Sequence, residues 1–302
     1  MHIKTLTKFF PGVKTAAVDS LNLEVNDGEI VGFAGLNGAG KTTAIRICAG
    51  IIFPSSGTAE IDGHDIVSDK KRASCNIGWV PEFPNFEPNA KPIGLLNYYG
   101  RFYTINKKDL EDRIELLLKA TGLAEHTGKK LKTYSQGMKK RFSLASALLS
   151  DPRNLLLDET LNGLDPEGIR YVKALILSMK KEGRAIFLSS HILSELENVA
   201  DRIAIIKSGK VVGIVGRNEL SHLGNRQTIR LTVGNPDSKL ITILQSYGDV
   251  SRDGNDFSVT NLNADAEKAN LANSELAKAG YVVSRFNVEG ENFEDYFFRL
   301  VG

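Results

Sequence analysis

The sequence predicts an α/β fold built on a parallel sheet, followed by a smaller α+β unit. Apolar runs of strand length alternate with segments whose apolar residues recur at helical spacing, and a glycine-rich loop follows the first of these runs. Strands that alternate with helices are typical of a parallel sheet. The pattern changes near residue 220, where shorter strands and helices begin. We therefore expect a large unit over residues 1–220 and a small unit over 221–302.

The large unit is expected to begin with short strands and to continue into a strand, a loop and a helix. Residues 21–25 alternate apolar and polar side chains, and a turn signal follows at 26–28. Residues 29–34 form a continuous apolar run, which is typical of a strand buried on both faces. A glycine-rich loop and a helical segment at 43–49 come next. Later β segments are predicted at 154–158, 185–189 and, with a turn at Ser208-Gly209, at 202–215.

Residues from about 88 to 151 are predicted to form a helical subdomain, because 107–121 and 135–149 carry apolar residues at helical spacing. The small unit is predicted to follow a linker at 217–225. Its pattern indicates a βαβαβ-like order that ends in a helix. The expected strands are 227–233, 256–260 and 281–286, and the expected helices are 238–247, 264–279 and 292–300.

Composition narrows the class of protein. The 302 residues are 42% hydrophobic and 25% charged, which is ordinary for a soluble protein. The net charge of +2 is too small to indicate nucleic-acid binding. No apolar stretch approaches the roughly 18–20 residues needed to cross a bilayer, and we expect no secretory signal. Cys48 and Cys75 match neither a disulfide framework nor a metal spacing, so we expect two unpaired thiols in a cytoplasmic protein.

The strongest motif is a full G-x-x-x-x-G-K-[ST] match directly after the apolar run at 29–34. Glycines let the backbone wrap around phosphates, and the helix N-terminus behind the loop favours an anion. Lys41 is expected to reach the β- and γ-phosphates, and the Thr42 hydroxyl to ligate Mg²⁺. A chance glycine-rich turn is the alternative, but the strand–loop–helix context favours a nucleotide site. That site comprises Gly35, Leu36, Asn37, Gly38, Ala39, Gly40, Lys41, Thr42 and Thr43.

A second motif is the apolar run 154–157, which ends in the two carboxylates Asp158 and Glu159. Asp158 is placed to hold Mg²⁺, as acidic strand ends do in P-loop enzymes. Glu159 is then the natural general base for an attacking water molecule. A pair of surface carboxylates is the alternative, and the upstream phosphate loop favours the catalytic interpretation.

A third motif separates this chain from other P-loop proteins. The segment 134–138 lies between the first two motifs and resembles the LSGGQ signature of the ABC ATPase family, with Ser135 and Gly137 retained. A hydroxyl and an unhindered backbone N–H at a helix N-terminus can contact a phosphate. The resemblance implies that Ser135, Gln136 and Gly137 bind ATP held by a second subunit. An ordinary N-cap role for Ser135 is the alternative.

Further landmarks of the same family follow in order. The segment 163–166 resembles the D-loop, which implies that Asp165 contacts the opposite subunit, and His191 resembles the switch histidine that senses the γ-phosphate. The segment 78–82 resembles the Q-loop, with Glu82 in place of the usual glutamine, and the resemblance implies that Glu82 reaches the metal and the attacking water. Phe10, in preference to Phe9, resembles the aromatic residue that stacks on adenine. Core packing is the alternative for both phenylalanines.

The resemblance covers about residues 1–220 and implies the P-loop NTPase fold, a RecA-like parallel sheet with antiparallel β and helical subdomains. The end of the chain, 291–300, resembles the LEDVF close of efflux-type ATPase subunits that carry a short C-terminal accessory domain. An amphipathic terminal helix that packs on its own domain is the alternative.

The resemblance implies an ATP- and Mg²⁺-dependent ATPase that dimerises head to tail with a second ATPase subunit, as a homodimer or heterodimer. It implies that the pair powers transport, on balance export, through a polytopic permease on the inner face of the membrane. No nucleic acid partner is expected. One alternative is a soluble ABC ATPase that acts on nucleic acid or the ribosome. Another is a regulatory subunit without hydrolysis, which the presence of Lys41, Asp158 and Glu159 opposes.

Overall fold

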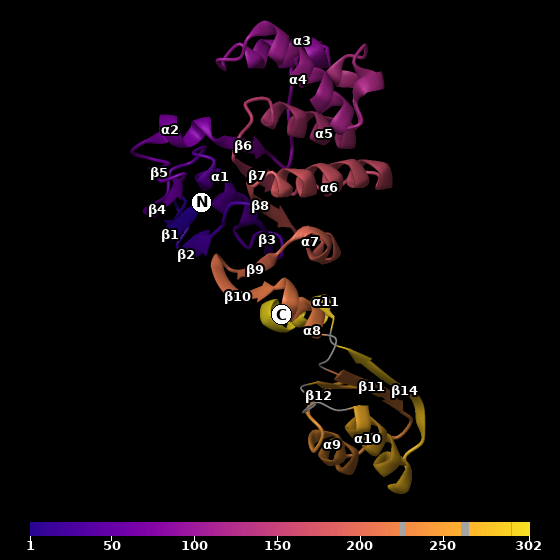
Figure 1. Ribbon diagram of the computed structural model, residues 1–302. Coiled ribbons are helices and arrows are strands. Elements are labelled where there is room, and N and C mark those ends of the chain that lie inside the picture. Colours follow the sequence, from indigo (N-terminus) through magenta and orange to yellow (C-terminus); the bar gives the residue numbers. More distant parts are fainter. Residues whose placement is uncertain (224–226, 261–265, 291) are drawn as a thin grey trace. The chain divides into compact units, whose positions relative to one another are not determined.

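A six-stranded sheet in the order β10-β9-β3-β8-β7-β6 lies at the centre of the first part of the chain (Figure 1). The five strands from β9 to β6 are parallel to their neighbours. The strands are β3 (Ile30–Ala34), β6 (Ile77–Val80), β7 (Asn154–Asp158), β8 (Ala185–Ser190), β9 (Arg202–Lys207) and β10 (Lys210–Gly216). The predicted α/β class with a parallel sheet is therefore confirmed.

The computed structural model describes residues 1–223, 227–260, 266–290 and 292–302. The chain divides into two compact units: Met1–Val215 with Val301, and Gly216–Leu300 with Gly302. No helix in the described part of the chain is both long and apolar enough to span a membrane.

Both faces of the parallel sheet are covered, which explains why its strands are continuous apolar runs. On one face Phe33 and Phe187 pack with their ring centroids 5.1 Å apart. On the other face Gly32 lies so close to α7 (Leu193–Val199) that an added Cβ would come within 3.2 Å of the Leu196 side chain. Helix α6 (Pro166–Lys181) also contacts β8.

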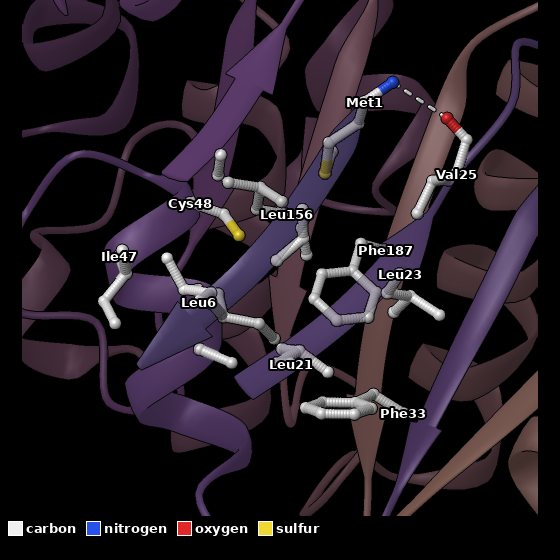
Figure 2. Packing of buried hydrophobic residues seen from close by; sticks show 14 of the residues in the cluster. Met1, Leu6, Leu21, Leu23, Val25, Phe33, Ile47, Cys48, Leu156 and Phe187 are labelled. Carbon is white, nitrogen blue, oxygen red and sulfur yellow. Dashed lines mark hydrogen bonds between the residues drawn. The ribbon is translucent and has the colours of Figure 1, made fainter. Parts of the chain in front are cut away.

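A four-stranded sheet, β2-β1-β4-β5, and helix α1 (Lys41–Cys48) cover the Phe33 face. The strands are β1 (His2–Lys8), β2 (Val18–Glu24), β4 (Ser56–Ile61) and β5 (His64–Asp65), and each pairs antiparallel with its neighbour in the sheet. Figure 2 shows the core between these layers, where the Met1 ammonium donates to the Val25 carbonyl at 2.9 Å. Cys48 lies in this core, where burial raises the pKa of its thiol to about 12. Cys75 is exposed, and both cysteines are unpaired as expected.

Helices dominate the stretch between β6 and β7. They are α3 (Pro92–Gly100), α4 (Lys107–Ala120), two short 3₁₀ turns (Ala124–His126 and Leu131–Thr133) and α5 (Gln136–Ala147); α2 (Lys70–Cys75) precedes β6. The Asn106 side chain caps α4 by accepting a hydrogen bond from the Asp109 amide. The apolar residues that predicted α4 are buried: Leu110, Ile114, Leu117 and Leu118.

The second unit contains one antiparallel sheet in the order β12-β13-β11-β14. Its elements are α8 (Arg217–Leu223), β11 (Gln227–Val233), α9 (Ser238–Gln245), β12 (Asp249–Asp253), β13 (Asp256–Thr260), α10 (Ala266–Lys278), β14 (Val283–Gly290) and α11 (Phe293–Val301). The inner face of the sheet packs on α9 and α10 through a core that includes Ile229, Leu231, Phe257, Leu244 and Leu276.

Two expectations for this second unit are wrong. The βαβαβ-like order lacks β12, because four of that strand's five residues are exposed and no apolar alternation marks it. The predicted linker at 217–225 contains helix α8 over Arg217–Leu223, and the rest of it, 224–225, lies outside the described residues. The predicted start of α10, at 264–265, also lies outside them.

Candidate active site

The loop between β3 and α1 is shaped by glycines that no other residue can replace without strain. Gly40 has φ +111°, and a Cβ there would lie 2.2 Å from the Ala17 carbonyl oxygen. At Gly35 a Cβ would lie 2.6 Å from the Ile206 side chain. Both distances are too short for real carbon contacts. The loop is therefore held tightly between Ile206 of β9 and the Ala17 backbone, with its own backbone curled at the start of α1.

This curl opens onto a cavity of about 320 Å³. The loop contributes most of the lining, and Glu82 and Glu159 contribute carboxylates. The structure therefore brings Glu82, from the segment after β6, to the phosphate loop. The lining residues are Ala17, Asn37, Gly38, Ala39, Gly40, Lys41, Thr42, Thr43, Glu82 and Glu159.

The Lys41 side chain folds back onto the loop, and the residue is only 6% exposed. Its Nζ donates to the carbonyl oxygens of Gly35, at 2.7 Å, and Leu36, at 3.3 Å. The same Nζ lies 3.3 Å from Oε1 of Glu159, which is also buried. An anion that enters the loop thus meets a lysine already held in place by the backbone.

Asp158 ends β7 in a fully buried position beside the phosphate loop. Its Oδ1 accepts hydrogen bonds from the Thr42 hydroxyl at 3.1 Å and from the Ser189 hydroxyl at 2.8 Å. Burial raises the pKa of Asp158, the neighbouring Glu159 charge adds to the rise, and the two hydroxyl hydrogen bonds oppose it.

The second carboxylate oxygen of Asp158, Oδ2, is buried and has no hydrogen-bond partner among the residues that the structure describes. A buried carboxylate oxygen that lacks a partner is costly, and a cation would satisfy it. Oxygen ligands such as those of Asp158 and Thr42 suit Mg²⁺, which binds through one or two protein oxygens together with substrate phosphates. Among the described residues, no group of three or more His, Cys, Asp or Glu side chains could hold a metal ion by itself. The residues therefore fit Mg²⁺ bound together with a phosphate.

Glu159 has an unusual backbone and a tightly held side chain. Its φ of +48° is rare for a residue other than glycine and is typical of strained functional positions. Its amide donates to the Ser189 hydroxyl oxygen at 3.0 Å. Its Oε2 accepts from the His191 amide at 3.2 Å and lies 3.1 Å from His191 Nδ1. The ends of β7 and β8 thus bring Glu159 and His191 together.

Asn162 is a member of this cluster that sequence reasoning missed. Its side-chain nitrogen hydrogen-bonds Glu159 Oε2 and lies 2.9 Å from His191 Nδ1. The sequence carried one usable signal, which is that Asn162 follows Glu159 by three residues and can fold back over it in a turn. Ser189 was predicted only as the last residue of the 185–189 strand, yet its hydroxyl hydrogen-bonds both the Asp158 carboxylate and the Glu159 amide.

The segment resembling the signature does not reach the cavity. Ser135 caps α5 by accepting from the Met138 amide at 3.1 Å, so the simple N-cap role exists. Ser135 and Gln136 are exposed. A Cβ at Gly137 would lie 3.5 Å from Leu164 Cδ2, so the start of α5 packs beside the loop that leads to Asp165. Asp165 precedes α6 and is also exposed.

Phe9 and Phe10 are both exposed, so neither packs in the core. The Lys8 ammonium lies 5.3 Å from the centre of the Phe10 ring. Phe10 lies outside the lining of the cavity, and its stacking on adenine stays a prediction.

Residues 18–162 match the family model described as ABC transporter. The bacitracin transport ATP-binding protein BcrA of Bacillus licheniformis is 36% identical over 307 residues, which cover 99% of this chain and 97% of that protein. The chain belongs to the family of ABC transporter ATP-binding subunits. This ABC subunit is also 33% identical over 195 residues to the Nod factor export ATP-binding protein I of Cupriavidus metallidurans, with 65% of this chain and 64% of that protein covered.

A solved structure of the ATP-binding subunit of an ABC transporter matches with a TM-score of 0.67 and 26% identity, covering 73% of this chain and 91% of that chain. The P-loop NTPase fold is therefore confirmed. The chain is therefore an ATPase of an ABC transporter, and the soluble nucleic-acid or ribosome alternative is not favoured.

Proposed function

We propose that this ATPase works as one of two subunits that enclose ATP head to tail, and that Glu159 is the general base of hydrolysis. The single observation that carries the proposal is the geometry of the Glu159 carboxylate. It lines the phosphate cavity, with one oxygen facing Lys41 and the other held by His191 and Asn162. A carboxylate fixed in this way beside a phosphate loop is oriented to take a proton from an attacking water molecule.

The phosphate loop and its neighbours have separate roles in binding ATP and Mg²⁺. Backbone amides of Gly35, Leu36, Asn37, Gly38, Ala39 and Gly40, together with Thr43, bind the phosphates. Lys41 exchanges its contacts with the Gly35 and Leu36 carbonyls for phosphate oxygens. Thr42 and Asp158 would hold Mg²⁺, and Glu82, which lines the same cavity, would supply a further carboxylate for the metal and the attacking water. When bound, Mg²⁺ neutralises charge that develops on the phosphates. His191 and Asn162 orient Glu159, and His191 senses the γ-phosphate.

A second ATPase subunit completes each site. Ser135, Gln136, Gly137 and Asp165 lie outside the cavity that Lys41 and Glu159 share, and three of the four are exposed. Their phosphate-binding chemistry at the start of α5 is therefore directed at an ATP held by a partner, either another copy of this chain or a related subunit. Phe10 stacks on the adenine of the subunit's own ATP.

The permease docks in a groove between β6, the segment after it, and helices α3 and α5. The groove has a volume of about 330 Å³ and an aromatic lining that includes Trp79, Phe86, Tyr99 and Tyr103. Trp79 Nε1 is buried beside this groove and has no hydrogen-bond partner in the described part of the chain. Because Glu82 and this groove belong to the same segment, docking is linked directly to the ATP site.

In this arrangement the subunit sits on the inner face of the membrane through its permease, residues 1–220 act as the motor, and 221–302 form an accessory domain. One relative of this chain, BcrA, is a bacitracin transport ATP-binding protein, and another is a Nod factor export ATP-binding protein. The cargo of this chain is determined by its permease, and the export direction is the one that the Nod factor relative's name gives.

The test is Glu159→Gln, which keeps the side-chain shape and its contacts with His191 but removes the base. We expect kcat for ATP hydrolysis to fall about 10²- to 10⁴-fold, while ATP still binds and a dimer now persists in its presence. ATPase assays and light scattering with ATP measure both. The exposed Glu125→Gln is the matched control and keeps wild-type turnover. Robust hydrolysis by Glu159→Gln would remove Glu159 as the base.

A further inference from the structure

Lys140 is a buried lysine that the mechanism above does not use. It lies in α5, five residues after the cap Ser135, and its side chain is 7% exposed. Its Nζ donates to the carbonyl oxygens of Glu159, at 2.6 Å, and Asn162, at 2.7 Å. Because a buried ammonium is costly unless its protons are hydrogen-bonded, these two contacts are the ones that retain it there.

The same two residues are held from the opposite side by the catalytic cluster. The Glu159 carboxylate and the Asn162 amide contact each other and His191. The turn from Glu159 to Asn162 is thus held at two places: its side chains contact His191, and its carbonyl oxygens accept hydrogen bonds from Lys140. Glu159 in this turn has φ +48°, a backbone conformation that persists only when surrounding contacts stabilise it.

Lys140 also faces three carboxylates of the site. Burial lowers the pKa of its ammonium, and the charges of Glu82, Glu159 and Asp158 oppose this lowering. A neutral side chain of the same length would avoid the desolvation cost but would leave both carbonyls without their donor.

The helix that carries Lys140 begins with the residues assigned to the partner's ATP. Ser135 and Gly137 lie within the first turn of α5, and Gly137 packs beside the Gly163-Leu164 segment. Within one helix, a shift at the first turn is transmitted to the next because backbone hydrogen bonds fix the turns to each other. Lys140 is therefore the contact by which α5 holds the Glu159–Asn162 turn.

We propose that Lys140 is a positioning residue that connects Glu159 to α5, the helix that begins at the signature segment. Hydrolysis of the ATP bound to one subunit then depends on whether α5 of the same subunit has bound the partner's ATP. The inference rests on the proposed function, since it needs Glu159 as the base and α5 as the trans contact. Its alternative is a purely structural lysine that stabilises the turn and nothing more.

The experiment compares Lys140→Met, which keeps the stem and removes the ammonium, with Lys140→Arg, which keeps a donor cation. The adjacent, half-buried Lys139→Met makes the same chemical change one position away and serves as the control. ATPase activity of the full chain is measured against ATP concentration and expressed per ATP-binding site, counted by titration with a fluorescent ATP analogue. Misfolded protein is thereby excluded from kcat.

For Lys140→Met we expect kcat per site to fall at least tenfold, the affinity of the isolated subunit for ATP to stay within twofold, and the Hill coefficient to drop toward 1. Lys140→Arg should recover at least half of kcat and of the cooperativity, and Lys139→Met should match the wild type. A Lys140→Met protein with wild-type kcat per site and Hill coefficient overturns the inference, as does a Lys140→Arg protein that binds ATP without any recovery. Failure of the proposed function is distinguishable, because the wild type would then not hydrolyse ATP or Glu159→Gln would remain active.

Discussion

The Gly137→Ala variant should change the ATPase activity of the cassette, residues 1–220, without lowering its stability. A Cβ at Gly137 would lie 3.5 Å from Leu164 Cδ2 and 3.6 Å from the Gly163 carbonyl oxygen, which are ordinary van der Waals contacts. Gly137 is helical, so alanine should stabilise α5 by about 0.5–1 kcal/mol. The free energy of unfolding of Gly137→Ala is therefore expected to equal or slightly exceed that of the wild type.

The expected loss of activity comes from outside the subunit. In the proposed dimer the Gly137 amide faces the partner's γ-phosphate, and a methyl group beside it hinders that approach. A hydrogen bond to a charged group contributes about 1.5–3 kcal/mol. Since 1.4 kcal/mol is a factor of ten, kcat/KM for ATP should fall roughly ten- to 150-fold.

Urea unfolding and steady-state ATPase assays measure the two quantities on the same preparation. Gly94→Ala is the matched control, because Gly94 is an exposed glycine in α3 where a Cβ would meet nothing within 4 Å. It should gain similar stability and keep full activity. Wild-type kcat/KM in Gly137→Ala would refute the trans contact, and a loss of more than about 1 kcal/mol of stability would refute the packing argument.

Two further predictions concern other parts of the chain. Ser146→Trp fills the groove lined by Trp79 and Tyr103, so the co-purifying permease should be lost while ATP binding remains. Ser178→Trp, at an exposed position of α6, is the control. Equal permease recovery from both variants would contradict the docking site. Truncation after residue 222 should leave a folded cassette that unfolds cooperatively and binds ATP, as followed by circular dichroism and nucleotide titration; an insoluble product would show that the proposed boundary near residue 220 is wrong.

Most of the active site could be predicted from the sequence because its parts are local motifs. The phosphate loop is a continuous segment whose glycines are fixed by backbone geometry, as the 2.2 Å approach of Ala17 to a Cβ at Gly40 demonstrates. Asp158 and His191 each end an apolar run, and parallel strands bring their carboxyl ends to one edge of a sheet. The joining of Glu159 to His191 follows from those two facts.

Features without a repeating pattern could not be predicted. Strand β12 has the sequence DVSRD, with four of its five residues exposed, so no apolar alternation marks it and its pairing with β13 decides its structure. Helix α8 was mistaken for a linker because seven residues are too few to establish a helical period. For Asn162 the one signal was its position three residues after Glu159, and that spacing does not by itself show that a turn returns its side chain to Glu159.

By itself the sequence determined the α/β class, the family and the segments that form the candidate nucleotide site, namely the phosphate loop and the two carboxylates after the 154–157 run, because each depends on residue types at short, fixed spacings. Only the tertiary structure decided which buried polar atoms lack partners and which find them. The unpartnered Oδ2 of Asp158 and the two carbonyls held by Lys140 are examples. The physical reason is that hydrogen bonds between α5 and the end of β7 join residues about twenty positions apart, and their geometry exists only after the sheet and its helices have packed.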